Sequence, residues 1–218
     1  YENTEYETYD FIPVWDAEAY ALADGLTDWD VPFITVNIAG MENPNTKNVT
    51  TAEELKTALE AADAATINVT EDISLTNLGA ITVGASHTVS VASGKTVTIA
   101  GSTNINVDTH TLTIQGAGKE NSNLVCNRSS GFALYGLSGT LRLEDITVEV
   151  IGGLGLQMGN ADIDSGARLV LNVPGEDNLV VVGTSFDVSG EVDIQDFDSV
   201  AISLQGGSMT IKNGGTVK

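Results

Sequence analysis

The sequence predicts an all-β solenoid, a stack of coils built from short strands, preceded by one helix. After Ala65 the apolar residues alternate with polar ones as far as the C-terminus, in runs of three to five residues separated by Gly, Asn, Asp and Ser. A motif of a small residue, a glycine and alternating apolar residues recurs along these runs. No second helical pattern interrupts them, and the spacing is too short for strand–helix–strand units.

The recurring glycines indicate the length of one coil. They are Gly94, Gly139, Gly166, Gly190 and Gly207, which lie 45, 27, 24 and 17 residues apart. A coil of three short strands and their turns takes roughly 20 to 25 residues, so these spacings fit one coil or two, and roughly six or seven coils in total. We expect one continuous core that contains Val97/Ile99, Leu141/Leu143, Leu169/Leu171, Val192/Ile194 and Met209/Ile211.

Residues 50–63 form the clearest helical segment of the chain. Thr50 or Thr51 can be the N-cap, and Glu53 or Glu54 three residues later can complete a capping box. The stripe expected to be buried comprises Leu55, Ala58, Leu59 and Ala62. Because the end of a solenoid exposes apolar side chains and strand edges, we expect this helix to cap the first coil, with its leucines facing the core.

Residues 1–46 form an acidic N-terminal extension, which we separate from a region at 47–218 that holds the helix and the solenoid. The extension contains ten Asp and Glu residues and no Lys or Arg. Within it, residues 16–23 fit a short helix, and residues 31–38 read as one strand with Pro32 at its entry.

Composition excludes several classes of partner and site. A net charge of −21 repels phosphate backbones and anionic lipids, which argues against nucleic acid and membrane surfaces as partners. No run reaches the ~20 apolar residues of a membrane span. Cys126 is the only cysteine, so the chain has no disulfide framework and no paired-cysteine metal site. We predict no cofactor. The sequence begins at Tyr1 with no initiator Met and no basic-then-apolar segment, so we expect either a mature secreted product or a trimmed sequence.

The helix and the strands after it resemble a known family. The capped helix leading into residues 66–75, followed by Gly94–Ile99 and Gly139–Val148, is similar to the N-terminal part of pectin-lyase-like β-helices, especially those of bacterial surface proteins. The resemblance covers about residues 48 to 218. It implies a right-handed parallel β-helix and an extracellular or cell-surface location in bacteria. It leaves function open, because enzymes, adhesins and fibres share this fold.

Polysaccharide-degrading chemistry has weak support in the residues. A pectate lyase would need clustered carboxylates for Ca²⁺ and a basic residue, and Arg128, Arg142 and Arg168 are the only arginines. Asn160-Ala161-Asp162 with Asp164 is similar to the Asn-x-Asp element of polygalacturonase-like hydrolases, but the other elements of that family are absent. We interpret Asp162 and Asp164 as solvated residues on the coils, and we predict no catalytic residues and no enzyme activity.

Other candidate residues have structural explanations. His87 and His110 are each flanked by Thr, which favours turn or outward-facing positions. Cys126 alternates with Leu124 and reads as a buried apolar residue. The outward Thr pairs Thr96/Thr98, Thr109/Thr111 and Thr111/Thr113 could stack into a water-ordering array, as in ice-binding solenoids. They stop after residue 113, so the strand propensity of Thr explains them better.

Three functional classes remain. The sequence favours an extracellular structural protein that self-assembles into a filament or layer. The alternative is an adhesin or carbohydrate-binding module, whose partner would be a glycan or a host surface. A polysaccharide lyase or hydrolase comes last.

The expected partner is a second copy, bound head to tail. The chain reaches Lys218 in strand-like sequence, and a bare strand edge there would accept another strand. We expect the N-terminal strand of one copy to add to this edge of the next copy, which builds an open filament. Two alternatives stay open: the segment folds back on its own solenoid, or the sequence ends before a natural C-terminal cap. The residues of this assembly interface are Phe33, Ile34, Val36, Ile38 and Val217.

Overall fold

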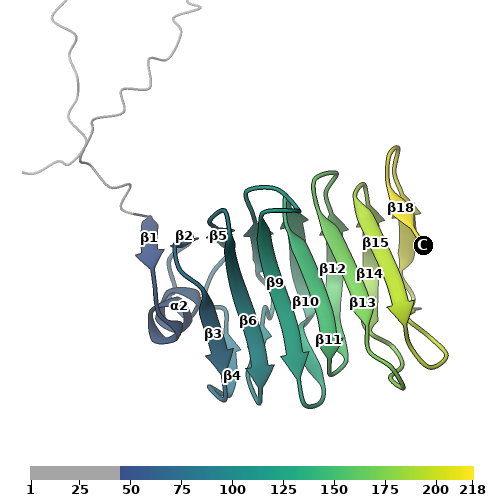
Figure 1. The fold of residues 1–218 in the computed structure, drawn as a ribbon, viewed down its shortest axis with the longest axis horizontal. Helices are drawn as coiled ribbons and strands as arrows, with labels where there is room; N and C mark the ends of the chain where they lie inside the picture. Colours follow the sequence, from purple (N-terminus) through teal and green to yellow (C-terminus); the bar gives the residue numbers. More distant parts are fainter. Residues whose placement is uncertain (1–44) are drawn as a thin grey trace, which may run out of the picture. The chain divides into compact units, whose positions relative to one another are not determined.

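The structure is a computed structural model that describes residues 45–218. It confirms the predicted all-β class: short strands stack as a parallel solenoid, with a single short helix on the N-terminal side of the described chain (Figure 1). Every strand pair in these residues is parallel. Residues 16–23 and 31–38 lie outside the described residues.

Each coil passes through three columns of strands. The first column, in the 11-stranded sheet A, holds β1 (Thr46–Val49), β2 (Thr66–Val69), β5 (His87–Val91), β8 (Thr111–Gln115), the later parts of β10 (Phe132–Glu144), β12 (Gly155–Ile163) and β14 (Val180–Val188), and β17 (Ser208–Ile211). The second column is the seven-stranded sheet B, with β3 (Ile73–Thr76), β6 (Lys95–Gly101), β9 (Ser122–Arg128), β11 (Thr147–Gly152), β13 (Arg168–Asn172), β15 (Glu191–Asp196) and β18 (Thr216–Val217). The third column belongs to sheet A and holds β4 (Ala80–Thr82), β7 (Asn104–Asn106), the first parts of β10, β12 and β14, and β16 (Ile202–Leu204).

The coil length agrees with the glycine spacing. Equivalent positions in the first column lie between 20 and 29 residues apart, with Thr140 opposite Asn160 and Thr111 opposite Thr140 as the extremes. Sheet B contributes one strand to each coil, and its seven strands match the expected number of coils. The spacing varies because the turns differ in length and because some strand pairs contain register shifts, as between Gly136 and Thr140 of β10.

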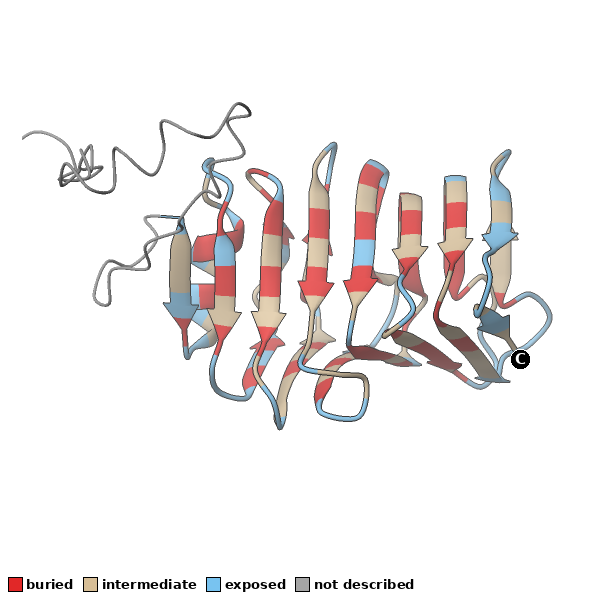
Figure 2. Cartoon of the chain, turned by 90° about the horizontal axis from the view of Figure 1, so that it is seen from above, coloured by how far each residue is buried: buried red, intermediate tan, exposed pale blue. Residues whose placement is uncertain are grey.

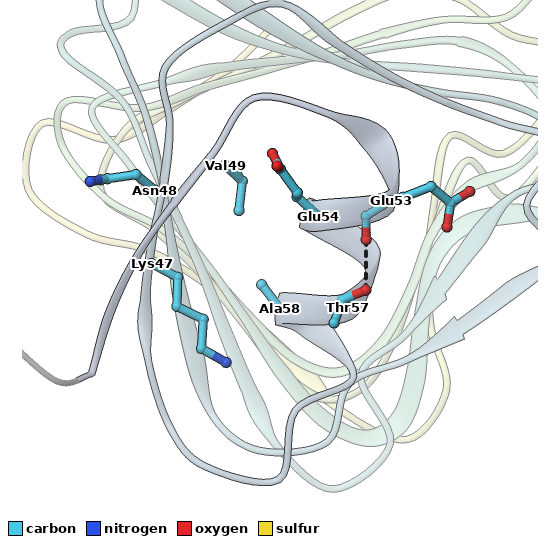
Figure 3. A pocket seen from close by; sticks show the side chains of 7 residues that line it. All are labelled: Lys47, Asn48, Val49, Glu53, Glu54, Thr57 and Ala58. Carbon is cyan, nitrogen blue, oxygen red and sulfur yellow. Dashed lines mark hydrogen bonds between the residues drawn. The ribbon is translucent and has the colours of Figure 1, made fainter.

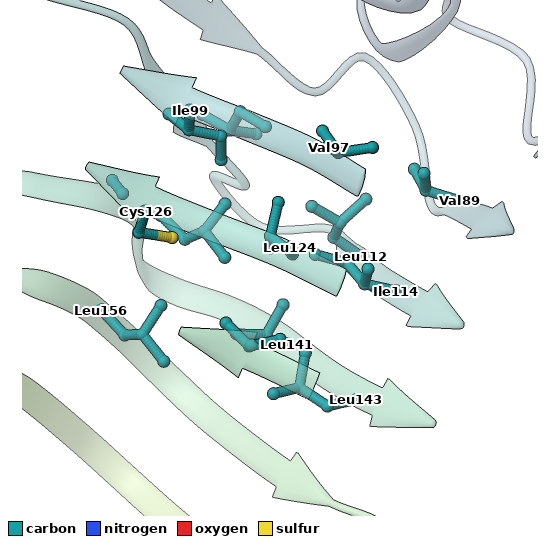
Figure 4. Close-up of a cluster of buried hydrophobic side chains, with 14 of the residues drawn as sticks. Val89, Val97, Ile99, Leu112, Ile114, Leu124, Cys126, Leu141, Leu143 and Leu156 are labelled. Atoms are coloured by element: carbon teal, nitrogen blue, oxygen red, sulfur yellow. The ribbon is translucent and has the colours of Figure 1, made fainter. Parts of the chain in front are cut away.

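Alternate side chains of each strand point inward and form one core. Figure 2 shows buried residues alternating with less buried ones along the strands, and Figure 4 shows aliphatic side chains from successive coils stacked on one another. Most of the predicted core is confirmed: Val97, Ile99, Leu141, Leu143, Leu169, Leu171 and Val192 are buried, and Ile194 and Met209 pack against them. The prediction for Ile211 is wrong. It is 54% exposed, since no further described coil covers β17.

The predicted cap is the helix α2 (Ala52–Leu59), whose leucines Leu55 and Leu59 join the core. Thr51 is the N-cap, and Glu54 completes the capping box by accepting the Thr51 N–H at 3.1 Å. The helix thereby covers the apolar interior at the first coil.

The helix ends earlier than predicted, at Leu59, and Ala62 is exposed instead of buried. The Leu59 carbonyl accepts a hydrogen bond from Gly84 N at 2.9 Å, so a neighbouring coil replaces the next helical bond. Gly84 permits this approach because a Cβ there would lie 2.4 Å from the Glu60 carbonyl oxygen. Tertiary contacts therefore end the helix.

Strand β1 was not predicted from the sequence. It pairs in register with β2, so that Thr46 lies opposite Thr66 and Val49 opposite Val69. Lys47 occupies an inward position, which breaks the apolar alternation that identifies the other strands. In the described residues, the solenoid thus includes one strand before the cap helix.

The cap can be tested with a matched pair of substitutions. Leu59→Ala removes a side chain that is 1% exposed, and it should lower the free energy of unfolding by about 2–5 kcal/mol. Ala62→Asp, at the exposed position just beyond the helix, should change it by no more than about 0.5 kcal/mol. Urea unfolding followed by circular dichroism measures both. Equal effects of the two substitutions would show that α2 does not cap the core.

Candidate functional site

Uncharged polar side chains form two ladders on the outer face of sheet A. The ladders run over β1, β2, β5 and β8, the first four strands of the first column. We call these eight side chains the threonine–asparagine face. The register aligns Thr46, Thr66, Thr88 and Thr113 in one ladder, and Asn48, Asn68, Ser90 and Gln115 in the other. Within the second ladder, Asn68 Nδ2 donates to Asn48 Oδ1 at 3.0 Å.

The alternation of β1, β2, β5 and β8 produces this face. In β2, Ile67 and Val69 point into the core, so Thr66 and Asn68 point outward. Neighbouring strands lie about 4.8 Å apart, and outward residues on one strand about 6.7 Å apart. The face is therefore a regular, flat grid of hydroxyl and amide groups, all exposed or half-buried.

The threonine–asparagine face is itself uncharged. None of the eight side chains is charged, although the chain carries −21 overall. In the next coils the threonine ladder continues as Arg142, Asp162 and Asp187. The threonine ladder is thus uncharged in its first half and charged in its second, whereas the neighbouring ladder of Thr140, Asn160, Ser185 and Ser208 stays uncharged.

The charged half is held together by ion pairs between coils. Arg142 Nη2 lies 3.5 Å from Asp162 Oδ2, and Lys212 Nζ lies 3.2 Å from Asp187 Oδ2 and 4.0 Å from Asp162 Oδ1. Asp164 is exposed and accepts the Ser165 N–H at 2.6 Å. Asp164 is thus solvated, as interpreted, whereas Asp162 lies half-buried on its coil in an ion pair.

A second ion-pair cluster lies on the outer face of sheet B. Glu191 meets Lys218 Nζ at 2.5 Å and Lys119 Nζ at 3.6 Å, while the Arg168 guanidinium bonds to Asp193. The hydrogen bond from Lys218 lowers the pKa of Glu191, and the one from Arg168 lowers the pKa of Asp193. The Arg168 pKa is raised by the same bond to Asp193. These carboxylates are therefore ionised partners in pairs and poor proton donors.

The prediction of an outward-facing or turn position for His87 is wrong. Its side chain is 2% exposed and lies on the inward face of β5, in line with Val89. Nδ1 accepts the Ala65 N–H at 3.2 Å, so Nε2 carries the proton and donates to the Ala61 carbonyl at 3.2 Å. This histidine bonds the backbone segment that links the cap helix to β2.

The environment of His87 favours the neutral imidazole. Burial is the main cause that lowers its pKa, and the positive charge of Lys47 on β1 acts in the same direction. The hydrogen bond that Nε2–H donates to the Ala61 carbonyl opposes the shift without cancelling it. His110 lies in a turn, as predicted.

Cys126 is buried between coils, as the sequence predicts. It is aligned with Ile99 and Val150 in the interior column of sheet B. Burial raises the pKa of its thiol to about 12, so the thiolate required of a nucleophile is not accessible near neutral pH.

Residues 45–218 contain no group of three or more His, Cys, Asp or Glu side chains that could hold a metal ion. Within the same residues, no helix combines the length and apolarity needed to cross a membrane.

The predicted assembly interface is described only in part. Phe33, Ile34, Val36 and Ile38 lie outside the described residues. Val217 lies half-buried in β18, where it is aligned with Val192 of β15. The head-to-tail contact between these residues stays a prediction.

Comparison with known proteins identifies a family. A family model described as a pectate lyase-like adhesive domain matches residues 46–176, from β1 into the fifth coil. No curated protein and no solved structure matches the chain. The matched region includes the cap helix and the whole threonine–asparagine face.

The buried His87 predicts a pH dependence of stability. Its pKa is lower in the folded protein than in the unfolded chain, where it is about 6.5, so below that pH the unfolded chain binds more protons. The contribution of His87 is complete above about pH 6.5 and is lost as the pH falls toward the folded-state pKa. Urea unfolding between about pH 7.5 and pH 5 should show this loss.

Two variants test whether His87 causes this pH dependence of stability. His87→Gln cannot be protonated and should show a smaller loss of stability on acidification than the unsubstituted protein. His110→Gln, in the turn before β8, should keep the full loss. An identical pH profile for His87→Gln and the unsubstituted protein would contradict the assignment.

Proposed function

The chain belongs to the pectate lyase-like adhesive domain family, and we propose that it is a non-enzymatic adhesive module that binds uncharged glycans through its threonine–asparagine face. The observation that carries the proposal is a neutral, regular grid of hydrogen-bonding groups on an otherwise strongly acidic protein.

The chemistry of the face suits a neutral polymer rich in hydroxyl groups. Threonine hydroxyls and Asn or Gln amides each supply both donors and acceptors, as sugar hydroxyls do. Each exchange of water for sugar contributes little, but repetition over four strands adds many weak contacts. An anionic polymer would be repelled by the net charge of −21, which favours an uncharged one.

The positions of the three arginines support a role without catalysis. The Arg128 guanidinium donates to the backbone carbonyls of Phe132 and Ser102. Arg142 and Arg168 are ion-paired with Asp162 and Asp193. A lyase needs a basic group that is free to take a proton from its substrate. All three arginines already have partners in the fold.

An adhesive module has to be exposed to its target, so we place the protein outside the cell, at a bacterial surface. The adhesive description of the family and the resemblance to β-helices of bacterial surface proteins support this location. The sequence alone favours a structural, self-assembling protein over an adhesin. The family match reverses this order, because it supports adhesion and gives no support to a filament or layer.

The proposed face can be tested by introducing charge. Thr66→Glu with Thr113→Glu places two carboxylates on the face, two strands apart. It should weaken binding to insoluble uncharged polysaccharides, such as cellulose and chitin, by at least about tenfold, because buried carboxylates would lose their hydration. Pull-down and depletion assays measure the affinity, and circular dichroism checks the fold.

The matched control is Ser74→Glu with Val125→Glu, two strands apart on the outer face of sheet B. It adds the same charge to the molecule and should leave binding unchanged. The proposed face is wrong if both double variants bind as tightly as the unsubstituted protein. It is also wrong if the unsubstituted protein binds none of a panel of uncharged glycans. Release of unsaturated or reducing products from polygalacturonate would contradict the non-enzymatic role.

A further inference from the structure

The N-terminal end of the described solenoid has a groove beside an open strand edge. The groove measures about 490 Å³ and lies between β1 and α2. Figure 3 shows Val49 and Ala58 facing one another across it, whereas Asn48 points away. The lining residues are Lys47, Asn48, Val49, Glu53, Glu54, Thr57 and Ala58. Among the described strands, β1 pairs only with β2.

The backbone of β1 is arranged to accept another strand. The carbonyls of Asn45 and Val49 accept the N–H groups of Thr66 and Thr70 at 2.8 and 3.2 Å. Successive residues of a strand direct their backbone groups to opposite sides, so those of Thr46 and Asn48 face away from β2. They form the edge to which a further strand can bond.

A segment of the chain outside the described residues has the sequence of such a strand. Residues 35–38 read Thr-Val-Asn-Ile, whereas β1 reads Thr-Lys-Asn-Val and β2 reads Thr-Ile-Asn-Val. In β1 and β2 this tetrapeptide directs Thr and Asn outward and the other two residues inward. Residues 35–38 thus match the alternation that a further strand of this column needs.

The spacing along the chain indicates which copy supplies that strand. Equivalent positions in the first column lie 20 to 29 residues apart, but Thr35 precedes Thr46 by only 11 residues. A parallel strand from the same chain would need a complete coil in between, for which the seven residues 39–45 are too few. A parallel strand on β1 therefore has to come from a second copy.

We propose that residues 33–38 of one copy add to the β1 edge of a second copy as a parallel strand. Val36 lies over Lys47, and Ile38 lies over Val49 and Ala58 in the groove. Thr35 and Asn37 extend the two ladders of the threonine–asparagine face by one position each.

The exchange is reciprocal. The donated strand and the accepting edge of one chain are joined by seven residues, which span at most about 25 Å. Both therefore contact the same partner, and the assembly closes as a two-fold dimer, which replaces the open head-to-tail filament expected from the sequence. An inward lysine on an edge strand discourages indiscriminate strand addition. The positive charge of Lys47 favours a donor strand from residues 1–46, because this segment has ten carboxylates and no Lys or Arg.

A designed disulfide tests the register and the source of the strand. In the full chain, Thr35→Cys with Thr46→Cys puts two thiols opposite each other on paired strands, about 4.8 Å apart at Cα and within disulfide reach. Oxidation should give a covalent dimer of twice 22.7 kDa on a non-reducing gel. Thr35→Cys with Asn48→Cys is two residues out of register and should stay mostly unlinked. Cys126 is buried and does not compete.

A backbone variant tests the edge itself. Asn48→Pro removes an N–H that faces away from β2 and should make the full chain monomeric in sedimentation equilibrium, with the fold kept. Asn48→Ala retains that N–H and should remain dimeric. The proposal is overturned if the unsubstituted chain is monomeric at high concentration or if the Thr35/Thr46 disulfide forms within one chain. Head-to-tail polymers that persist in Asn48→Pro also overturn it.

Discussion

The in-register stacking of parallel strands is the constraint on which the rest of this structure depends. Each coil hydrogen-bonds only to the coil before and the coil after it, so every residue lies directly opposite its equivalents. Most inward positions are therefore apolar in coil after coil, as in the column of Ile99, Cys126 and Val150, and the inward His87 is a hydrogen-bonded exception. Outward positions are released from packing and can repeat one polar residue along the solenoid.

The same constraint creates both the proposed adhesive face and the problem of the first coil. Stacking turns a single outward threonine into a ladder, which is how short strands with few aromatic residues present a repeated surface. It also leaves the first coil with bare apolar side chains and a strand edge. The helix α2 covers the apolar side chains, and His87 bonds the helix to the second coil through Ala61. The edge of β1 is not covered by the helix.

The sequence predicted what depends on local pattern and missed what depends on register. The capping box and the alternating strands are local, so the fold and the cap could be predicted. The threonine ladder was hidden because Thr46, Thr66, Thr88 and Thr113 are unequally spaced, and only the turns determine that they align. His87 shares its parity with Val89 and Val91, a signal of burial that its Thr neighbour obscured. The exposure of Ile211 follows from the number of described coils.

Distances between spin labels along one ladder measure this stacking most directly. Thr66 shares a ladder with Asp162, Asp187 and Thr210, which lie four, five and six coils away. Double electron–electron resonance on spin labels at Thr66 and at each of these three positions should give backbone separations of about 19, 24 and 29 Å, respectively. This is an increase of about 4.8 Å per coil. Separations that do not increase with coil number would contradict in-register parallel stacking.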